Sequence, residues 1–275
     1  MVAIGGGAGG IVVALLFLVL QLMGGGSVND LGGLGSMPQD DTSSGDFQER
    51  CATGAAANEY ADCRVAGAIT SLDAYWTDAL PAAGTSLRYP GVVVFDDQTT
   101  TACGTGSGST GPFYCPGDET IYLDTTFFDV LESQFGASGG PLAEMYVVAH
   151  EYGHHLENQL GVFDVANRAD AGAGSDSVKV ELMADCLAGV WVGHAATTKD
   201  ASGNTLLEPL SQSQVEDAMS AAAAVGDDRI QEATQGEVDP HTFTHGSAEE
   251  RVEAFVTGYE RGTVAACDSF GVVSG

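Results

Sequence analysis

The chain has 275 residues, 44 % of them hydrophobic, so it can bury the core of one sizeable domain or two small ones. Its 9 lysines and arginines stand against 38 aspartates and glutamates, a formal net charge of -29 that excludes nucleic acid as a partner and disfavours anionic lipid headgroups. This acidity fits either the solubility of an exported protein or adaptation to high salt, and the sequence does not choose between them.

The N-terminal segment is apolar and carries no charge as far as Asn29. The run from Ile11 to Met23 reaches about 20 Å as a helix, short of a hydrocarbon core of about 30 Å, but the apolar and glycine residues before it supply the missing length. We therefore expect an uncleaved membrane anchor over residues 1–26. A cleaved signal peptide is the alternative, although a basic leader and an A-x-A-like site are both lacking. Residues 27–47 are rich in Gly, Ser, Asp and Pro and predict a flexible linker.

The remaining residues, 48–275, predict one helix-rich domain. Apolar residues at helical spacing predict a helix over 58–80. Short β-branched and aromatic runs predict strands at 92–95 and 121–123, separated by a glycine-serine loop at 104–111. Further helices are expected over residues 125–135, 141–160, 177–196, 211–225 and 247–261, the last two opened by capping boxes. This order of elements predicts an α+β fold with a small sheet.

The chain has six cysteines and no CxxC pair, so a structural zinc site built on cysteine is disfavoured. Disulfides in an oxidising compartment fit better, and they place the bulk of the chain outside the cytoplasm. The pairing does not follow from the sequence. We favour three pairs, of which the first two close short loops and would each add about 3 kcal/mol of stability: Cys51 with Cys63, Cys103 with Cys115, and Cys186 with Cys267.

The predicted helix over 141–160 contains an HExxH sequence, His150-Glu151-Tyr152-Gly153-His154. Residues i and i+4 project from one face of a helix, so two imidazoles can bind one zinc ion. Glu151 lies beside them and is expected to act as the general base toward a metal-activated water. Chance alone produces this pattern in about one chain of this length in a hundred, so it needs supporting features.

A third ligand is offered by Glu181, which lies in the predicted helix over 177–196 with Asp185 one turn later. Asp185 is expected to accept the second ring N–H of His150 or His154 and so fix its tautomer. The two carboxylates could instead be solvated helix surface, but most sides of this helix are apolar. Glu181 is therefore expected to complete the metal site.

Four other histidines compete with Glu181 for the third position. His155 is rotated by about 100° from His154 around the helix and points elsewhere. His194 is about 20 Å from Glu181 along the same predicted helix, so the two cannot share an ion. His241 and His245 lie in a loop before the last helix and are not excluded by geometry.

With these residues in hand, the chain resembles the neutral zinc metallopeptidase family of bacterial membrane-anchored proteins. The resemblance implies a zincin-like fold with the HExxH helix beneath the cleft, a glutamate as the third zinc ligand, and an N-terminal membrane segment. The family commonly has Gln where Glu157 stands, and its longer, often basic leader is lacking here. The GPFYCP and ELMADC blocks are specific to the family. The matching stretches cover most of the domain and comprise residues 51–64, 103–124, 147–162, 180–195, 245–262 and 267–270.

His245 also has a possible catalytic role. Thermolysin-like enzymes use a downstream histidine to steady the oxyanion of the tetrahedral intermediate, and His245 follows Glu181 in the chain. The alternative is that His245 organises the start of the last helix together with Gly246 and Ser247.

The leading functional expectation is a membrane-anchored, Zn²⁺-dependent peptidase, single-pass, with its catalytic domain outside the cytoplasm. It would hydrolyse peptide or protein substrates through a water activated by Glu151. One alternative is a catalytically silent zinc-binding scaffold or interaction module at the cell surface. Another is a zinc amidase acting on cell-wall peptides. The sequence reveals neither substrate preference nor oligomeric state.

Overall fold

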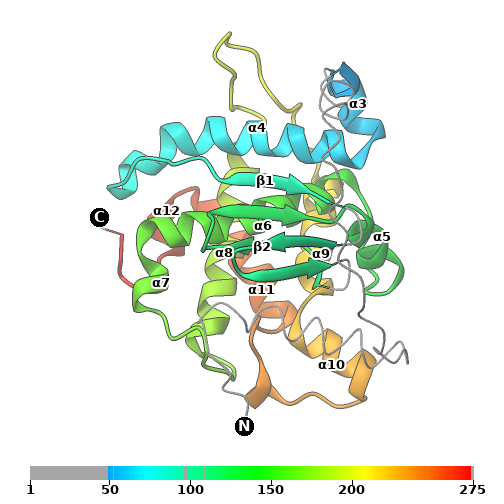
Figure 1. The fold of residues 1–275 in the computed structure, drawn as a ribbon, viewed down its shortest axis with the longest axis vertical. Coiled ribbons are helices and arrows are strands. Elements are labelled where there is room, and N and C mark those ends of the chain that lie inside the picture. The colour runs from blue at the N-terminus through cyan, green and yellow to red at the C-terminus, as the bar shows by residue number, and fades with distance from the viewer. Residues whose placement is uncertain (1–48, 52, 96–97, 108–109, 274–275) are drawn as a thin grey trace.

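The computed structural model describes residues 49–273, except for 52, 96–97 and 108–109 (Figure 1). The expected membrane anchor over 1–26 and the linker over 27–47 therefore lie outside the described residues. Within the part that is described, no helix is long and apolar enough to cross a membrane.

Helices form most of the domain and two small sheets accompany them, in agreement with the α+β class. The helix expected over 58–80 is divided at Tyr60, whose extended backbone (φ -114°, ψ 129°) separates α3 from α4. The capping boxes expected at Ser211 and Ser247 are both present. The helices are α3 (Gly54–Glu59), α4 (Ala61–Ala79), η1 (Leu80–Ala83), α5 (Thr126–Ser133), α6 (Pro141–Leu160), α7 (Val162–Val165), α8 (Asp176–Ala195), α9 (Gln212–Ala224), α10 (Asp227–Gln235), η3 (Pro240–Thr242), α11 (Ala248–Arg261) and α12 (Val264–Cys267).

Glycines bring the three central helices into backbone contact. A Cβ on Gly153 of α6 would lie 2.9 Å from the Cα atom of Ala184 in α8. A Cβ on Gly258 of α11 would lie 1.8 Å from the carbonyl oxygen of Cys186 in α8. Since real Cβ contacts are longer, only glycine permits these approaches. They place α8 directly between α6 and α11, so side chains from all three helices can meet.

The larger sheet has the strand order β1-β5-β4, with β1 (Gly91–Val94) parallel to β5 (Thr120–Leu123) and β4 (Phe113–Cys115) antiparallel to it (Figure 1). Strands β4 and β5 pack against α6. A separate antiparallel hairpin is formed by β2 (Gln98–Thr101) and β3 (Gly104–Ser107). Part of the expected glycine-serine loop is thus a strand. Gly106 belongs there because a Cβ would lie 2.7 Å from the Phe113 ring.

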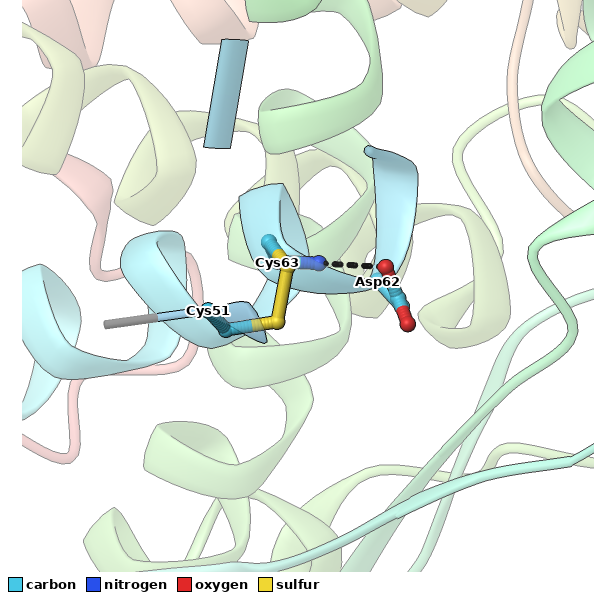
Figure 2. Close-up of side chains that lie close together, drawn as sticks. All are labelled: Cys51, Asp62 and Cys63. Carbon is cyan, nitrogen blue, oxygen red and sulfur yellow. Dashed lines mark hydrogen bonds between the residues drawn. A yellow bond between two sulfur atoms is a disulfide. The ribbon is translucent and has the colours of Figure 1, made fainter. Parts of the chain in front are cut away.

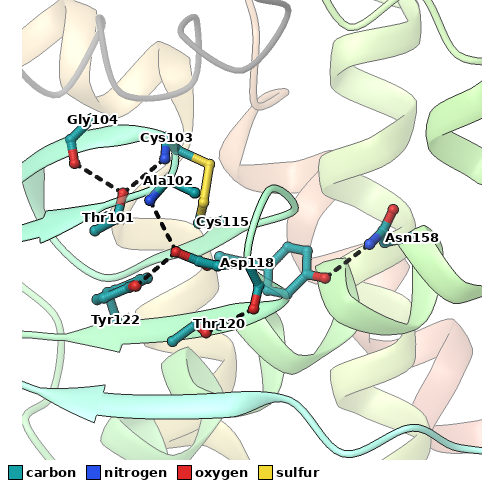
Figure 3. The surroundings of a disulfide bond; sticks show 10 residues. Thr101, Ala102, Cys103, Gly104, Cys115, Asp118, Thr120, Tyr122 and Asn158 are labelled. Carbon is teal, nitrogen blue, oxygen red and sulfur yellow. Dashed lines mark hydrogen bonds between the residues drawn. A yellow bond between two sulfur atoms is a disulfide. The ribbon is translucent and has the colours of Figure 1, made fainter.

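The structure contains three disulfides, and they are the three pairs favoured from the sequence. Cys186–Cys267 joins α8 to α12. Cys103–Cys115 joins the turn of the β2–β3 hairpin to β4, and Asp118 reinforces this junction by accepting hydrogen bonds from the Ala102 amide and the Tyr122 hydroxyl (Figure 3).

The third disulfide, Cys51–Cys63, lies beside the carboxylate of Asp62 (Figure 2). The three side chains are close enough together to suggest a metal site. Both sulfur atoms are consumed by the disulfide, however, and Asp62 already accepts the amide of Cys63 at 2.9 Å. This cluster is therefore not a metal site.

Candidate metal centre

Helix α6 places His150 and His154 one turn apart on a buried face. Pro141 opens the helix and Gly161, in the left-handed conformation, ends it, as the sequence predicts. The two imidazole centroids are 4.7 Å apart, and each histidine is 8 % exposed. Both rings therefore face one small region at the edge of the core.

Helix α8 brings Glu181 to the same region. Its Oε2 lies 3.2 Å from the Nε2 of His150, and its Oε1 lies 3.7 Å from the Nε2 of His154. Burial raises the pKa of Glu181, but the imidazoles of His154 and His245 outweigh that effect and hold the pKa below its ordinary value. Glu181 is expected to be an anion here.

The donor set fits a zinc ion. Two imidazole nitrogens and one carboxylate oxygen lie within 4.8 Å of one another, and all three residues are buried. Glu181 Oε1 has no hydrogen-bond partner, although buried carboxylate oxygens normally have one. A divalent cation between the three side chains would provide the missing interaction, and two histidines with one glutamate are a common catalytic zinc set.

A buried network orients His150. Its Nδ1 lies 2.8 Å from Asp185 Oδ1, which is the type of hydrogen bond expected from the sequence. Arg251 of α11 donates to both carboxylate oxygens of Asp185, at 2.7 and 3.0 Å, and Tyr146 donates its hydroxyl to Oδ1. Burial raises the pKa of Asp185, but Arg251 and His150 bring it down to about 2. Asp185 thus accepts the Nδ1–H and leaves Nε2 for the metal.

His154 is oriented by Glu157, at 2.8 Å between Nδ1 and Oε2. Glu157 is fully buried, its Oε1 has no hydrogen-bond partner, and burial raises its pKa well above the ordinary value. No role for Glu157 was predicted from the sequence. Its position three residues after His154 was the signal, because side chains at i and i+3 of a helix are neighbours.

Replacing Glu157 by Ala is expected to weaken zinc binding by about ten- to a hundredfold, because it removes the acceptor that orients His154. Glu157→Gln, whose amide oxygen can still accept the Nδ1–H of His154, is expected to bind zinc like the wild type. Competition with a zinc-chelating dye measures the change, and Glu253→Ala, on the exposed face of α11, is the matched control. A wild-type affinity in Glu157→Ala would show that Glu157 does not orient His154 for the metal.

Glu151 lies beside the metal group without belonging to it. It is 7 % exposed, and burial raises its pKa to about 7, while the backbone amide of Tyr114 in β4 acts in the opposite direction. Glu151 faces the same cleft as His150 and His154. Apolar side chains form part of the lining of this cleft: Phe127, Val147, Val225 and Ile230.

His245 is buried and lines this cleft from the segment before α11. Its Nδ1 is 3.3 Å from Asp227, whose carboxylate also accepts the backbone amides of Thr244, His245 and Gly246 at 2.7 to 3.0 Å. Burial lowers the pKa of His245, but the carboxylates of Glu181 and Asp227 outweigh burial and raise it. Asp227 was missed in the sequence because α10, which it opens, is too polar to show an apolar pattern.

The other histidines lie away from the metal group. The ring of His155 is 3.1 Å from the Tyr114 hydroxyl and 2.6 Å from the carbonyl of Arg88. His194 interacts with the Val190 carbonyl of its own helix, and His241 is exposed in η3. Among the described residues, only one group that contains histidine can hold a metal ion, and it consists of the three predicted ligands.

Comparison with known proteins identifies one family to which the sequence is similar. A family model described as "Putative neutral zinc metallopeptidase" matches residues 1–270. The uncharacterized protein Rv2575 of Mycobacterium tuberculosis is 50 % identical over 222 residues, which are 80 % of this chain and 74 % of that protein. The uncharacterized protein YpfJ of Escherichia coli K12 is 38 % identical over 201 residues, 71 % of this chain and 67 % of that protein. No solved structure matches significantly.

Proposed function

The chain belongs to the neutral zinc metallopeptidase family, and on that premise we propose that it hydrolyses peptide bonds with a zinc ion held by His150, His154 and Glu181. One observation carries the proposal. Two oriented imidazoles and an unpartnered carboxylate oxygen converge in a cleft, and a fourth buried group, Glu151, stands beside them without joining the set. A purely structural zinc site has no use for that fourth group.

The chemistry divides between the metal and the side chains. Zinc, when bound, would acidify a water molecule and polarise the scissile carbonyl. The carboxylate of Glu151 takes a proton from the attacking water and later returns it to the leaving amine. Burial that raises its pKa suits a group that must accept a proton. The apolar side chains that line part of the cleft would limit the access of competing water.

His245 is the group that would steady the oxyanion of the tetrahedral intermediate. Two features support this role. The ring lines the same cleft as Glu151, and Asp227 accepts from its Nδ1. The carboxylates of Glu181 and Asp227 raise the pKa of His245 and so favour the protonated ring, whose Nε2 is a hydrogen-bond donor. The alternative role, organising the start of α11, is already filled by the capping box of Ser247 and Glu250.

The location that we propose for the protein is supported by its N-terminal segment and its disulfides. The apolar run within residues 1–26 would anchor the chain as a single-pass membrane protein. The three disulfides favour an oxidising, extracytoplasmic compartment for the catalytic domain. The substrates would then be peptides or proteins outside the cytoplasm. The HExxH helix packed against a small sheet is consistent with a zincin-like fold.

Removal and return of zinc tests the proposed function. The full-length, zinc-loaded protein is expected to cleave members of a peptide library, to stop after dialysis against a chelator, and to recover when equimolar zinc is restored. Mass spectrometry of the digest identifies the cleaved bonds. Equimolar zinc without any turnover would instead favour the silent scaffold, and cleavage confined to cell-wall peptides would favour the amidase.

A further inference from the structure

A chain of hydrogen bonds joins helix α6, which carries the two histidine ligands, to strand β4 at the cleft. The side-chain amide of Asn158 in α6 donates to the hydroxyl of Tyr114 in β4 at 2.9 Å, and this hydroxyl lies 3.1 Å from the Nδ1 of His155, also in α6. The Nε2 of His155 lies 2.6 Å from the backbone carbonyl of Arg88, in the segment before β1. Three separate segments of the chain therefore meet at one imidazole.

The partners fix the direction of each hydrogen bond in this junction. The carbonyl of Arg88 can only accept, so the Nε2 of His155 carries a proton. The Tyr114 hydroxyl accepts from Asn158 and keeps its own hydrogen, which it donates to Nδ1 of the neutral imidazole. His155 is 0 % exposed and Tyr114 is 9 % exposed. Since a satisfied polar network in the interior holds one geometry, the junction is rigid.

Tyr114 reaches the proposed general base through its backbone and not through its hydroxyl. Burial raises the pKa of Glu151 to about 7, and a hydrogen bond from the backbone amide of Tyr114 acts in the opposite direction. Strand β4 ends the sheet order β1-β5-β4, so one side of its backbone is left for the cleft, which Tyr114 and Glu151 both line. The ring of Tyr114 is thus held by the part of α6 beyond the metal ligands, while its amide contacts the glutamate between them.

We propose that His155 and Tyr114 are positioning residues, which hold Glu151 and strand β4 in the alignment that proton transfer requires. The inference rests on the proposed peptidase function. Glu151 has to reach the attacking water and later the leaving amine, and a misplacement of about 1 Å can lower a rate by about a hundredfold. The helix alone fixes Glu151 relative to the metal ligands, and the junction fixes it relative to the wall of the cleft that β4 forms.

A merely structural role for the junction predicts a different result. The loss of a hydrogen bond that only stabilises the fold lowers the melting temperature and leaves the reaction of the folded enzyme unchanged. A positioning role lowers kcat in folded, zinc-loaded protein and changes KM little, because the alignment of the base matters in the transition state. The same sheet offers a comparison, since the hydroxyl of Tyr122 in β5 donates to Asp118 and not to α6.

The test compares Tyr114→Phe with Tyr122→Phe in the full-length, zinc-loaded protein. Each substitution removes one tyrosine hydroxyl from the sheet and keeps the ring. His155→Ala removes the centre of the junction, and if it fails to fold, Tyr114→Phe alone decides. The readouts are zinc content, melting temperature, kcat and KM on a cleaved peptide, and hydrogen exchange of the β4 amides by mass spectrometry, which requires no turnover.

Tyr114→Phe and His155→Ala are expected to lower kcat by about ten- to a hundredfold, with KM within about threefold of the wild type and zinc content unchanged. Hydrogen exchange of the β4 amides should become about tenfold faster in these two variants, because the strand is no longer fastened to α6. Tyr122→Phe should retain the wild-type kcat and the wild-type exchange of β4, whatever its melting temperature.

A wild-type kcat in Tyr114→Phe, an equal loss of kcat in Tyr122→Phe, or a loss of zinc from folded Tyr114→Phe would each overturn the proposal. The exchange measurement separates this inference from the proposed function. If the wild type bound zinc and cleaved no peptide, faster exchange confined to the Tyr114 and His155 variants would uphold the positioning of β4 against Glu151 and reject the peptidase function. Unchanged exchange in both variants would reject the inference itself.

Discussion

Glu151→Gln is expected to keep its zinc and to lower kcat by about two to four orders of magnitude. The amide has the shape of the carboxylate but cannot accept a proton from the attacking water. Glu151 lies outside the three-residue metal group, so its loss leaves the donor set intact. Zinc analysis of the purified variant and its kcat on a peptide cleaved by the wild type measure both parts of the prediction.

The matched control for this substitution is Glu132→Gln, on the exposed side of α5, which should behave as the wild type. Cleavage by Glu151→Gln at the rate of the wild type would mean that another group takes the proton. Loss of zinc from Glu151→Gln would mean that Glu151 supports the metal site rather than the chemistry.

Glu181→Ala is expected to lose both metal and activity. Substitution of groups that merely orient zinc ligands weakens binding by about ten- to a hundredfold, so removal of a ligand should exceed that range. Zinc binds only the folded site, so zinc should raise the melting temperature of the wild type and not that of this variant. Elemental analysis and thermal unfolding with and without zinc give the two readouts.

His241→Ala is the informative control for Glu181→Ala, because His241 was a rival for the third ligand position in the sequence. The exposed position of His241 in η3 predicts full zinc binding for this variant. If His241→Ala lost zinc and Glu181→Ala retained it, the ligand set would have to be reassigned.

The parts of the fold that the sequence predicted correctly are set by local physics. Helix α6 has a proline at its start and a glycine at its end, and α9 and α11 begin with capping boxes. The spacing of His150 and His154 is itself a local property of a helix. Glu181 and Asp185 lie on one face of α8 for the same reason, because residues four apart in a helix project from the same side.

The missed features depend on contacts between distant segments. Arg251 reaches Asp185 only because α11 packs backbone to backbone on α8. Its one signal in the sequence was a charged residue on the helix face that also carries Phe255. The β2–β3 hairpin was missed because its threonines and glycines form strands by pairing with each other and by packing against Phe113, which no local pattern reveals.

Anomalous diffraction at the zinc absorption edge, from crystals of the zinc-loaded protein, would locate the ion directly. A single strong peak is expected between α6 and α8, about 2.0–2.2 Å from the Nε2 atoms of His150 and His154 and from a carboxylate oxygen of Glu181. A peak elsewhere, or an ion bound by the two imidazoles with the Glu181 side chain turned away, would contradict the assignment of the metal centre.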